Sequence, residues 1–152
     1  MTPYMLKSDD NPDGVDGSVF EGMIAGLKKD RPAFLANFAK TFFGAGVFHS
    51  PVSTETMTWA GNMAMLASPK ATTACVTAFG TTDFRSDMAH VTVPTLVIHG
   101  DDDQTVPIGA SGKAAAAAIP GAAIVVYEGA PHAVPFTHAE RLNADLLAFL
   151  KG

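Results

Sequence analysis

Two short apolar runs in the last third of the sequence, residues 93–99 and 123–127, constrain the fold more than any other feature. Both are rich in β-branched residues and nearly free of polar ones, which is typical of strands buried on both faces of a parallel sheet. Gly100 ends the first run, and an alanine-rich stretch at residues 113–119, closed by Pro120, predicts a helix between the two strands. This order predicts an α/β fold with a right-handed parallel crossover.

The loops that follow these strands carry the residues best suited to chemistry. The first loop holds Asp101, Asp102 and Asp103, and the second holds His132. Because catalytic groups gather at the carboxyl ends of strands in open α/β sheets, Asp103 and His132 are expected to be neighbours. A carboxylate that fixes the tautomer of an imidazole makes that ring a general base for a hydroxyl nucleophile. Asp103 is therefore the predicted acid and His132 the predicted base, with Asp101 and Asp102 solvated or capping the next helix.

A serine nucleophile is not recognisable in the sequence. Where the acid precedes the histidine, the serine is expected earlier, on a strand-to-helix turn with the pattern G-x-S-x-G. The nearest string, residues 109–113, has its second glycine one position early and opens the crossover helix, so Ser111 is interpreted as part of a solvated helix start. The three aspartates could in isolation bind a metal, but a strand-end carboxylate followed by Val106 and Pro107 is the context of a triad acid.

Residues 91–152 resemble the C-terminal end of an α/β-hydrolase, and more narrowly that of the cofactor-free haloperoxidase, arylesterase and γ-lactamase group. This resemblance implies that Asp103 is the triad acid and His132 the triad base. Ala133 departs from the glycine that usually follows this histidine, and its methyl group is expected to crowd the backbone there. The matching strings, in the order of the group, are PTLVIHGDDDQ (94–104), VP (106–107), SGK (111–113), VY (126–127), GAPH (129–132) and LNADLLAFL (142–150).

The resemblance extends upstream. Residues 7–14, 19–28 and 78–84 resemble the linker and the helical cap that follow the sixth strand in these enzymes. The whole chain is covered, but only as about the second half of the family's fold. The first half would hold the oxyanion-hole loop and the serine, so this chain alone is expected to be catalytically incomplete.

The expected organisation is a linker at residues 1–17, a helical cap at residues 18–90 and the C-terminal part of an α/β-hydrolase core at residues 91–152. The core part should contain two parallel strands, a crossover helix and a terminal helix. Two parallel strands make a poor sheet, so a hydrophobic strand edge should be exposed. A companion is therefore expected: a complementary N-terminal half, a second copy of the chain, or an aggregate.

Apolar residues recur at helical spacing through the cap and at the end of the chain. Helices are therefore expected over residues 19–28, 33–43, 71–78 and 139–150. Ser53 is the predicted N-cap of a further helix.

Two function classes follow from these features. The first is half of a serine hydrolase that acts on a small ester, lactam or acid, with Trp59, Thr105 and Val106 beside the acid as candidate acyl-pocket residues. The resemblance implies perhydrolase or haloperoxidase activity without haem, metal or another cofactor. The second class is a non-catalytic, truncated or engineered subdomain that associates with itself through its open sheet edge.

Composition narrows the setting. Apolar residues make up 47% of the chain and the net charge is −5, which excludes a disordered acidic tail and argues against nucleic acid as a partner. No run approaches the about 18 apolar residues of a membrane span, so no membrane contact is expected and the location is taken as cytoplasmic.

The remaining motifs favour structural interpretations. Residues 9–14 match the opening of a calcium loop, but Phe20 stands at its twelfth position, so a turn is the better interpretation. Cys75 is the only cysteine, which excludes an internal disulfide, and it is interpreted as a small buried hydrophobe. Four further histidines show no metal-ligand spacing and are interpreted as surface or locally hydrogen-bonded residues: His49, His90, His99 and His138.

Overall fold

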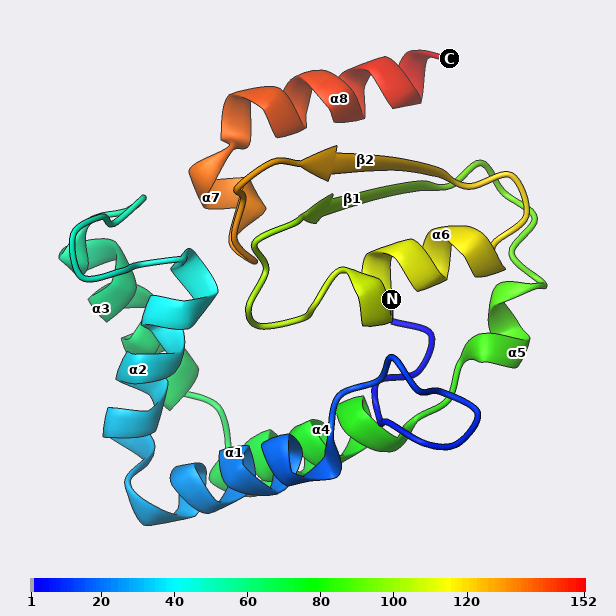
Figure 1. Cartoon of the computed structure of the whole chain (residues 1–152). Helices are drawn as coiled ribbons and strands as arrows, with labels where there is room; N and C mark the ends of the chain where they lie inside the picture. Colours follow the sequence, from blue (N-terminus) through cyan, green and yellow to red (C-terminus); the bar gives the residue numbers. More distant parts are fainter. Residues whose placement is uncertain (1) are drawn as a thin grey trace.

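A computed structural model describes residues 2–152 as a helical cap beside a two-stranded sheet and its covering helices (Figure 1). Along the chain the elements are α1 (Gly17–Lys29), α2 (Arg31–Phe43), α3 (Thr54–Met65), α4 (Pro69–Thr81), α5 (Arg85–Met88), β1 (Leu96–Gly100), the π-helical turn η1 (Gly109–Lys113), α6 (Ala114–Ala118), β2 (Ala123–Tyr127), α7 (Val134–Thr137) and α8 (Ala139–Lys151). The sequence correctly predicted this α/β architecture, with cap helices followed by two parallel strands, a crossover helix and a terminal helix, but not the short elements α5, η1 and α7.

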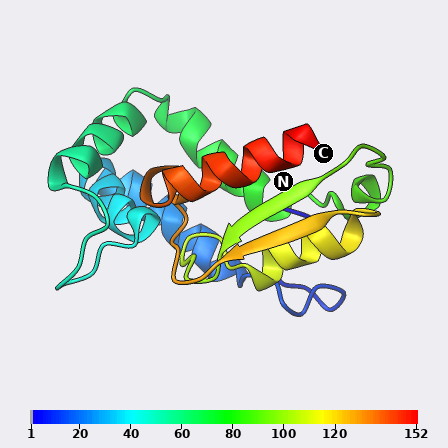
Figure 2. The same cartoon turned by 90° about the horizontal axis from the view of Figure 1, so that it is seen from above.

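The sheet consists of β1 and β2, which pair in parallel from Leu96 opposite Ala123 to Gly100 opposite Tyr127. Helix α8 lies on one side of the sheet and α6 on the other (Figures 1 and 2). The crossover between the strands is the predicted one, but it begins with the turn η1, which the sequence did not indicate. The first strand starts at Leu96 rather than at residue 93.

Side-chain caps explain where the cap helices begin. Asp16, Asp30, Ser53 and Ser68 each accept a hydrogen bond from a backbone N–H in the first turn of α1, α2, α3 and α4 respectively. The N-cap role of Ser53 is thus confirmed. Helices α2 and α4 both begin two residues earlier than predicted. Each carries a proline in its first turn, where a backbone N–H has no acceptor within the helix and its absence does not destabilise it.

The cap is folded as two helix pairs, α1 with α4 and α2 with α3 (Figure 1). On α2 the rings of Phe34, Phe38 and Phe42 follow one another with centroids 6.1 Å apart, as helical spacing predicted. At the end of α2, Phe43 is buried together with Ala133, the residue after the candidate base. The cap is therefore packed directly against the loop that carries His132.

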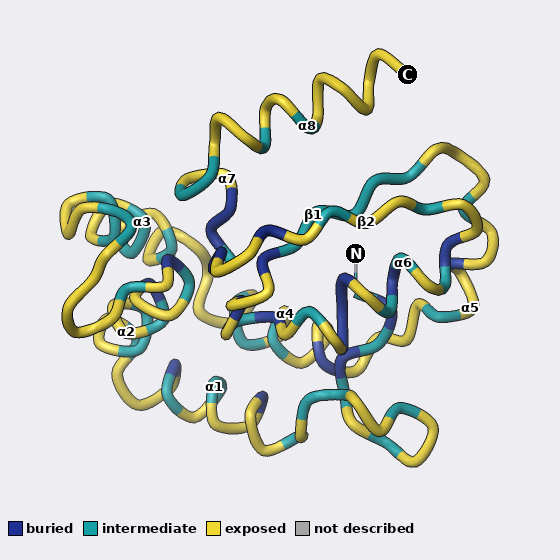
Figure 3. Tube along the Cα trace, turned by 45° about the horizontal axis from the view of Figure 1, so that its top comes forward, coloured by how far each residue is buried: buried dark blue, intermediate teal, exposed yellow. Residues whose placement is uncertain are grey.

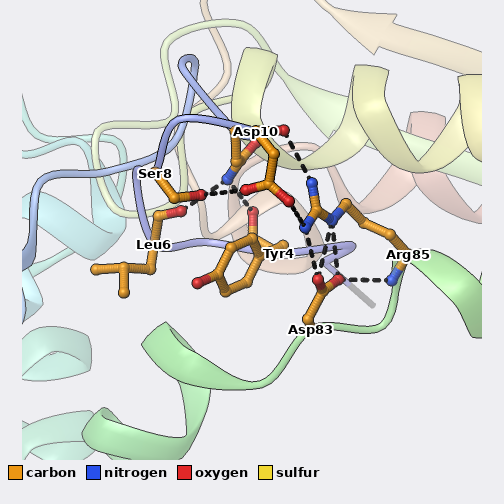
Figure 4. Close-up of polar contacts among 7 residues, drawn as sticks. Tyr4, Leu6, Ser8, Asp10, Asp83 and Arg85 are labelled. Atoms are coloured by element: carbon orange, nitrogen blue, oxygen red, sulfur yellow. Dashed lines mark hydrogen bonds and ion pairs between the residues drawn. The ribbon is translucent and has the colours of Figure 1, made fainter.

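Residues 2–16 fold back on the segment after α4. Met5 is buried with Phe20, and the N–H of Leu6 donates to the carbonyl of Gly80 over 3.1 Å. Figure 4 shows Arg85 bound to Asp10 at 2.8 Å and to Asp83. These ion pairs are exposed to solvent, so each contributes little to the stability of the fold. The apolar and backbone contacts therefore hold this segment in place.

Apolar side chains remain exposed on the sheet and on α8, much of which is exposed along its length (Figure 3). Ile124 and Val126 of β2 are exposed, which confirms the expectation of uncovered apolar strand residues. Leu147 and Leu150 of α8 are 55% and 76% exposed. Within residues 2–152 no helix combines the length and apolar character needed to cross a bilayer.

Gly44 ends α2 in the left-handed conformation, with φ at 68°. A Cβ at this position would lie 2.7 Å from the Cβ of Pro131, so Gly44→Ala adds steric overlap to backbone strain. We expect it to lower the free energy of unfolding by about 1–3 kcal/mol in urea titrations. Gly46→Ala is the matched control, because a Cβ there meets no described atom closer than 3.8 Å. An equal loss in both variants would contradict the prediction.

Candidate active site

Asp103 lies in the loop after β1 and is only 6% exposed. One carboxylate oxygen, Oδ1, accepts the N–H groups of Thr105 at 2.9 Å and Val106 at 2.8 Å. The other, Oδ2, lies 2.7 Å from Nδ1 of His132. An aspartate readily closes such a turn by binding the backbone two residues onward. Here the turn fixes one oxygen and presents the other to the imidazole.

His132 follows β2, and the structure places it against Asp103, as the strand-end argument expected. Because Asp103 is an acceptor, Nδ1 carries the proton and Nε2 is left with a lone pair. No hydrogen bond of residues 2–152 uses Nε2, and the side chain is 32% exposed. The Phe42 ring packs at 4.9 Å, centroid to centroid, and the Phe42 carbonyl accepts the N–H of Ala133. The imidazole is thus held on one side and open on the other.

The two loops are joined by a backbone ladder that continues the sheet. The N–H of Asp101 donates to the Tyr127 carbonyl, and the N–H of Asp102 donates to the Ala130 carbonyl. A Cβ at Gly100 would lie 2.0 Å from that Ala130 oxygen, so glycine is required for this close approach. The Asp101 side chain accepts the N–H of Gly129 at 2.6 Å. Asp101 is exposed, as the sequence predicted for a solvated residue, and in addition it fixes the second loop.

His99 is part of the site, although the sequence analysis did not select it. Its side chain is 13% exposed and hydrogen-bonded to a nearby carbonyl, so of the two interpretations, surface or locally hydrogen-bonded, the second applies. Nε2 donates to the Val106 carbonyl at 2.9 Å and lies 3.1 Å from Oδ2 of Asp103. No local pattern marked His99, because its partner Val106 becomes a neighbour only in the folded loop.

The electrostatics of the site favour an ionised acid. Burial acts to raise the pKa of Asp103, whereas its contacts with His132 and His99 lower it. Together with the Val106 N–H, these contacts outweigh burial and hold the pKa of Asp103 well below its usual range. The hydrogen bond between His99 and Asp103 also raises the pKa of His99. Asp103 is therefore a carboxylate across the neutral range.

A cavity of about 500 Å³ lies between the cap helices and the loop of Asp103. Thr105 and Val106 line it, as does Cys75, whose exposure contradicts the predicted burial. The Thr105 hydroxyl is buried and has no hydrogen-bond partner among residues 2–152. Trp59, on α3, is 53% exposed and is not brought to this cavity. The other lining residues, almost all apolar, are Met23, Leu27, Phe34, Leu35, Phe38, Ala67, Ala71, Thr72, Val76 and Phe79.

Two further expectations are corrected by packing. Ser111 is 2% exposed and donates to the Pro107 carbonyl at 2.7 Å, so it is a buried residue rather than a solvated one. Ala133 has φ at −78°, an ordinary value for any residue, and it is buried in a cluster with Ala39 and Phe43. Among the described residues, no three histidine, cysteine or acidic side chains are grouped to hold a metal ion.

Comparison with known proteins gives consistent relatives, although no protein-family profile matches the chain. It is 42% identical to non-heme chloroperoxidase CPO-A1 of Kitasatospora aureofaciens and 40% identical to a putative non-heme chloroperoxidase of Synechocystis sp.. A bifunctional esterase/perhydrolase of Acinetobacter calcoaceticus is 36% identical. These alignments cover 97–98% of this chain but 54% of each relative, so the chain spans about half the length of the curated relatives it matches.

Solved structures agree with the sequence comparison. The bromoperoxidase of Bacillus anthracis matches with a TM-score of 0.94 and 44% identity, over 99% of this chain and 55% of that one. An esterase of Exiguobacterium antarcticum matches with a TM-score of 0.88 and 25% identity, over 99% and 54%. In sequence and in fold, this chain is a homologue of the C-terminal half of the non-heme haloperoxidases, within the α/β-hydrolase superfamily.

Proposed function

We propose that this chain supplies the acid and the base of a serine-hydrolase triad, with Asp103 as the acid and His132 as the base. The observation that carries the proposal is the 2.7 Å contact between His132 Nδ1 and Asp103 Oδ2, together with an Nε2 that no described residue occupies. In a triad, Nε2 is the atom that takes the proton of the nucleophile. Asp103 fixes the tautomer that leaves this atom basic.

The serine is proposed to come from a polypeptide equivalent to the N-terminal half of the relatives. His132 would take the serine proton as Oγ attacks the carbonyl carbon of an ester or lactam. It would then return that proton to the leaving oxygen or nitrogen, giving an acyl-enzyme. Water would release a carboxylic acid, and hydrogen peroxide in its place would release a peracid. The perhydrolase and haloperoxidase activities in the names of the relatives support this second outcome.

The cavity beside the acid is the proposed acyl pocket. Thr105 and Val106 line it, and their N–H groups bind Asp103, so substrate and triad share one loop. A largely apolar lining of about 500 Å³ suits the acyl part of a small ester, lactam or acid. Trp59 lies outside this cavity, and its role stays a prediction.

The alternative is a non-catalytic unit that associates with itself. It is favoured by the exposed side chains of α8 and β2, chiefly Leu147, Leu150 and Val126. The same surface would be covered by an N-terminal half. A cytoplasmic location also stays a prediction.

Labelling with a fluorophosphonate, which bonds to activated serines, separates the two functions. The hydrolase proposal expects a second polypeptide, or an N-terminal extension of this chain, to carry the label in denaturing intact-mass spectra. Labelling should be lost when His132 is replaced. An unlabelled preparation of this chain that forms dimers in light scattering would favour the non-catalytic unit.

A further inference from the structure

The second histidine of the site, His99, has no part in the triad described above. A cavity of about 180 Å³ is lined by His99, Asp103 and His132, together with apolar residues and Gly100. These three are the titratable side chains that line it among the described residues. His99 therefore lies beside both the acid and the base, and a substitution at His99 alters the surroundings of both.

The protonation state of His99 follows from its partners. Nε2 lies 2.9 Å from the Val106 carbonyl, which only accepts hydrogen bonds, so Nε2 carries the proton. Gly112 packs against the other edge of the ring, where a Cβ would lie 2.7 Å from Nδ1. The ring is therefore fixed with its N–H toward Val106 and Asp103.

The backbone of Val106 connects His99 to the acid. Its carbonyl accepts from His99, and its N–H donates to Oδ1 of Asp103 at 2.8 Å. Nε2 of His99 also lies 3.1 Å from Oδ2, the oxygen that faces His132. His99 consequently acts on both carboxylate oxygens, on Oδ1 through the Val106 backbone and on Oδ2 directly.

We propose that His99 is a positioning residue for the Asp103–His132 pair: it holds the Val106 backbone against the carboxylate and draws part of the negative charge of Oδ2 away from His132. The direction of the effect follows from hydrogen bonding to a charged acceptor. Without the His99 N–H, the carboxylate becomes more basic and holds the His132 imidazolium more strongly. The role of this effect in catalysis rests on the proposed hydrolase function, but the effect of His99 on the Asp103–His132 pair does not.

The test is an NMR titration of His132 in the full chain, with its ring signals assigned by their loss in His132→Gln. In His99→Leu, the midpoint of the His132 titration should rise by about half a pH unit. Glutamine carries an N–H donor at the same distance from Cβ, so His99→Gln should return the midpoint to the wild-type value. His90→Leu is the matched control, because His90 is exposed and bonded only to the Ser86 carbonyl.

An unchanged midpoint in a folded His99→Leu variant would overturn the proposal, as would an equal shift in His99→Leu and His99→Gln. If the leucine variant does not fold, the wild-type chain still tests the proposal, because ¹⁵N chemical shifts identify which ring nitrogen of His99 carries a proton. A proton on Nδ1 of His99 with none on Nε2 contradicts the proposal, because the donor toward Val106 and Asp103 would then be missing. These signals need no serine, so absence of labelling by fluorophosphonate would leave this result standing.

Discussion

Replacing His132 with alanine is expected to lower kcat for ester hydrolysis by about 10⁴-fold, because the atom that takes the serine proton is lost. His132 combines a carboxylate partner at Nδ1 with an Nε2 that no described residue binds, in a side chain that is 32% exposed. The measurement is the initial rate of p-nitrophenyl acetate hydrolysis by this chain joined to the N-terminal half of the Kitasatospora relative. KM should change little, because the acyl pocket does not include His132.

His90→Ala is the control for this experiment. His90 is exposed, and its ring binds the carbonyl of Ser86, so its loss should leave the rate within about twofold of the parent. Circular dichroism should show the same helix content in both variants. A His132→Ala enzyme that keeps more than a tenth of the parent kcat would remove His132 from the role of base.

Asp103→Asn is the second large effect, with an expected loss of about 10⁴-fold in kcat. The asparagine oxygen can still accept the N–H groups of Thr105 and Val106, so the turn is kept. Its NH₂ group then donates to Nδ1 of His132, so the neutral ring carries its proton on Nε2 instead. The ring is held in place but no longer has a lone pair for the serine proton.

Asp103→Asn should also change how the free energy of unfolding depends on pH, which can be measured without any activity assay. The pKa of Asp103 is below its unfolded value of about 3.8, so the carboxylate stabilises the fold above that pH and this contribution fades as the pH falls through the folded value. Wild type should exceed Asp103→Asn by about 2 kcal/mol in free energy of unfolding at pH 7. Urea titrations at pH 7 and pH 3 should show this difference shrinking. A constant difference would mean that ionisation of Asp103 does not support the fold.

The sequence predicted those parts of the site that follow from the order of elements. Two apolar runs joined by a helix must place their carboxyl ends at one edge of a sheet, and that alone brings Asp103 to His132. The burial of Ser111 and the exposure of Cys75 depend on which neighbours the fold supplies, and no local pattern contains them. His99 was missed for the same reason, since its partner Val106 becomes a neighbour only when the acid loop folds back on the strand.

The contacts of residues 2–16 with the segment after α4 bear on how such enzymes diversify. The chain enters the cap beside Leu6 and leaves it beside Gly80, and these two points are joined by a hydrogen bond. An insert whose ends meet can be lengthened or exchanged at little entropic cost, because closure depends only weakly on loop length. The stretch between these points is therefore a replaceable cassette. Swapping it among homologous hydrolases should change which acyl groups fit the proposed pocket, as long as the replacement keeps the contacts that Phe42 makes with His132 and Ala133.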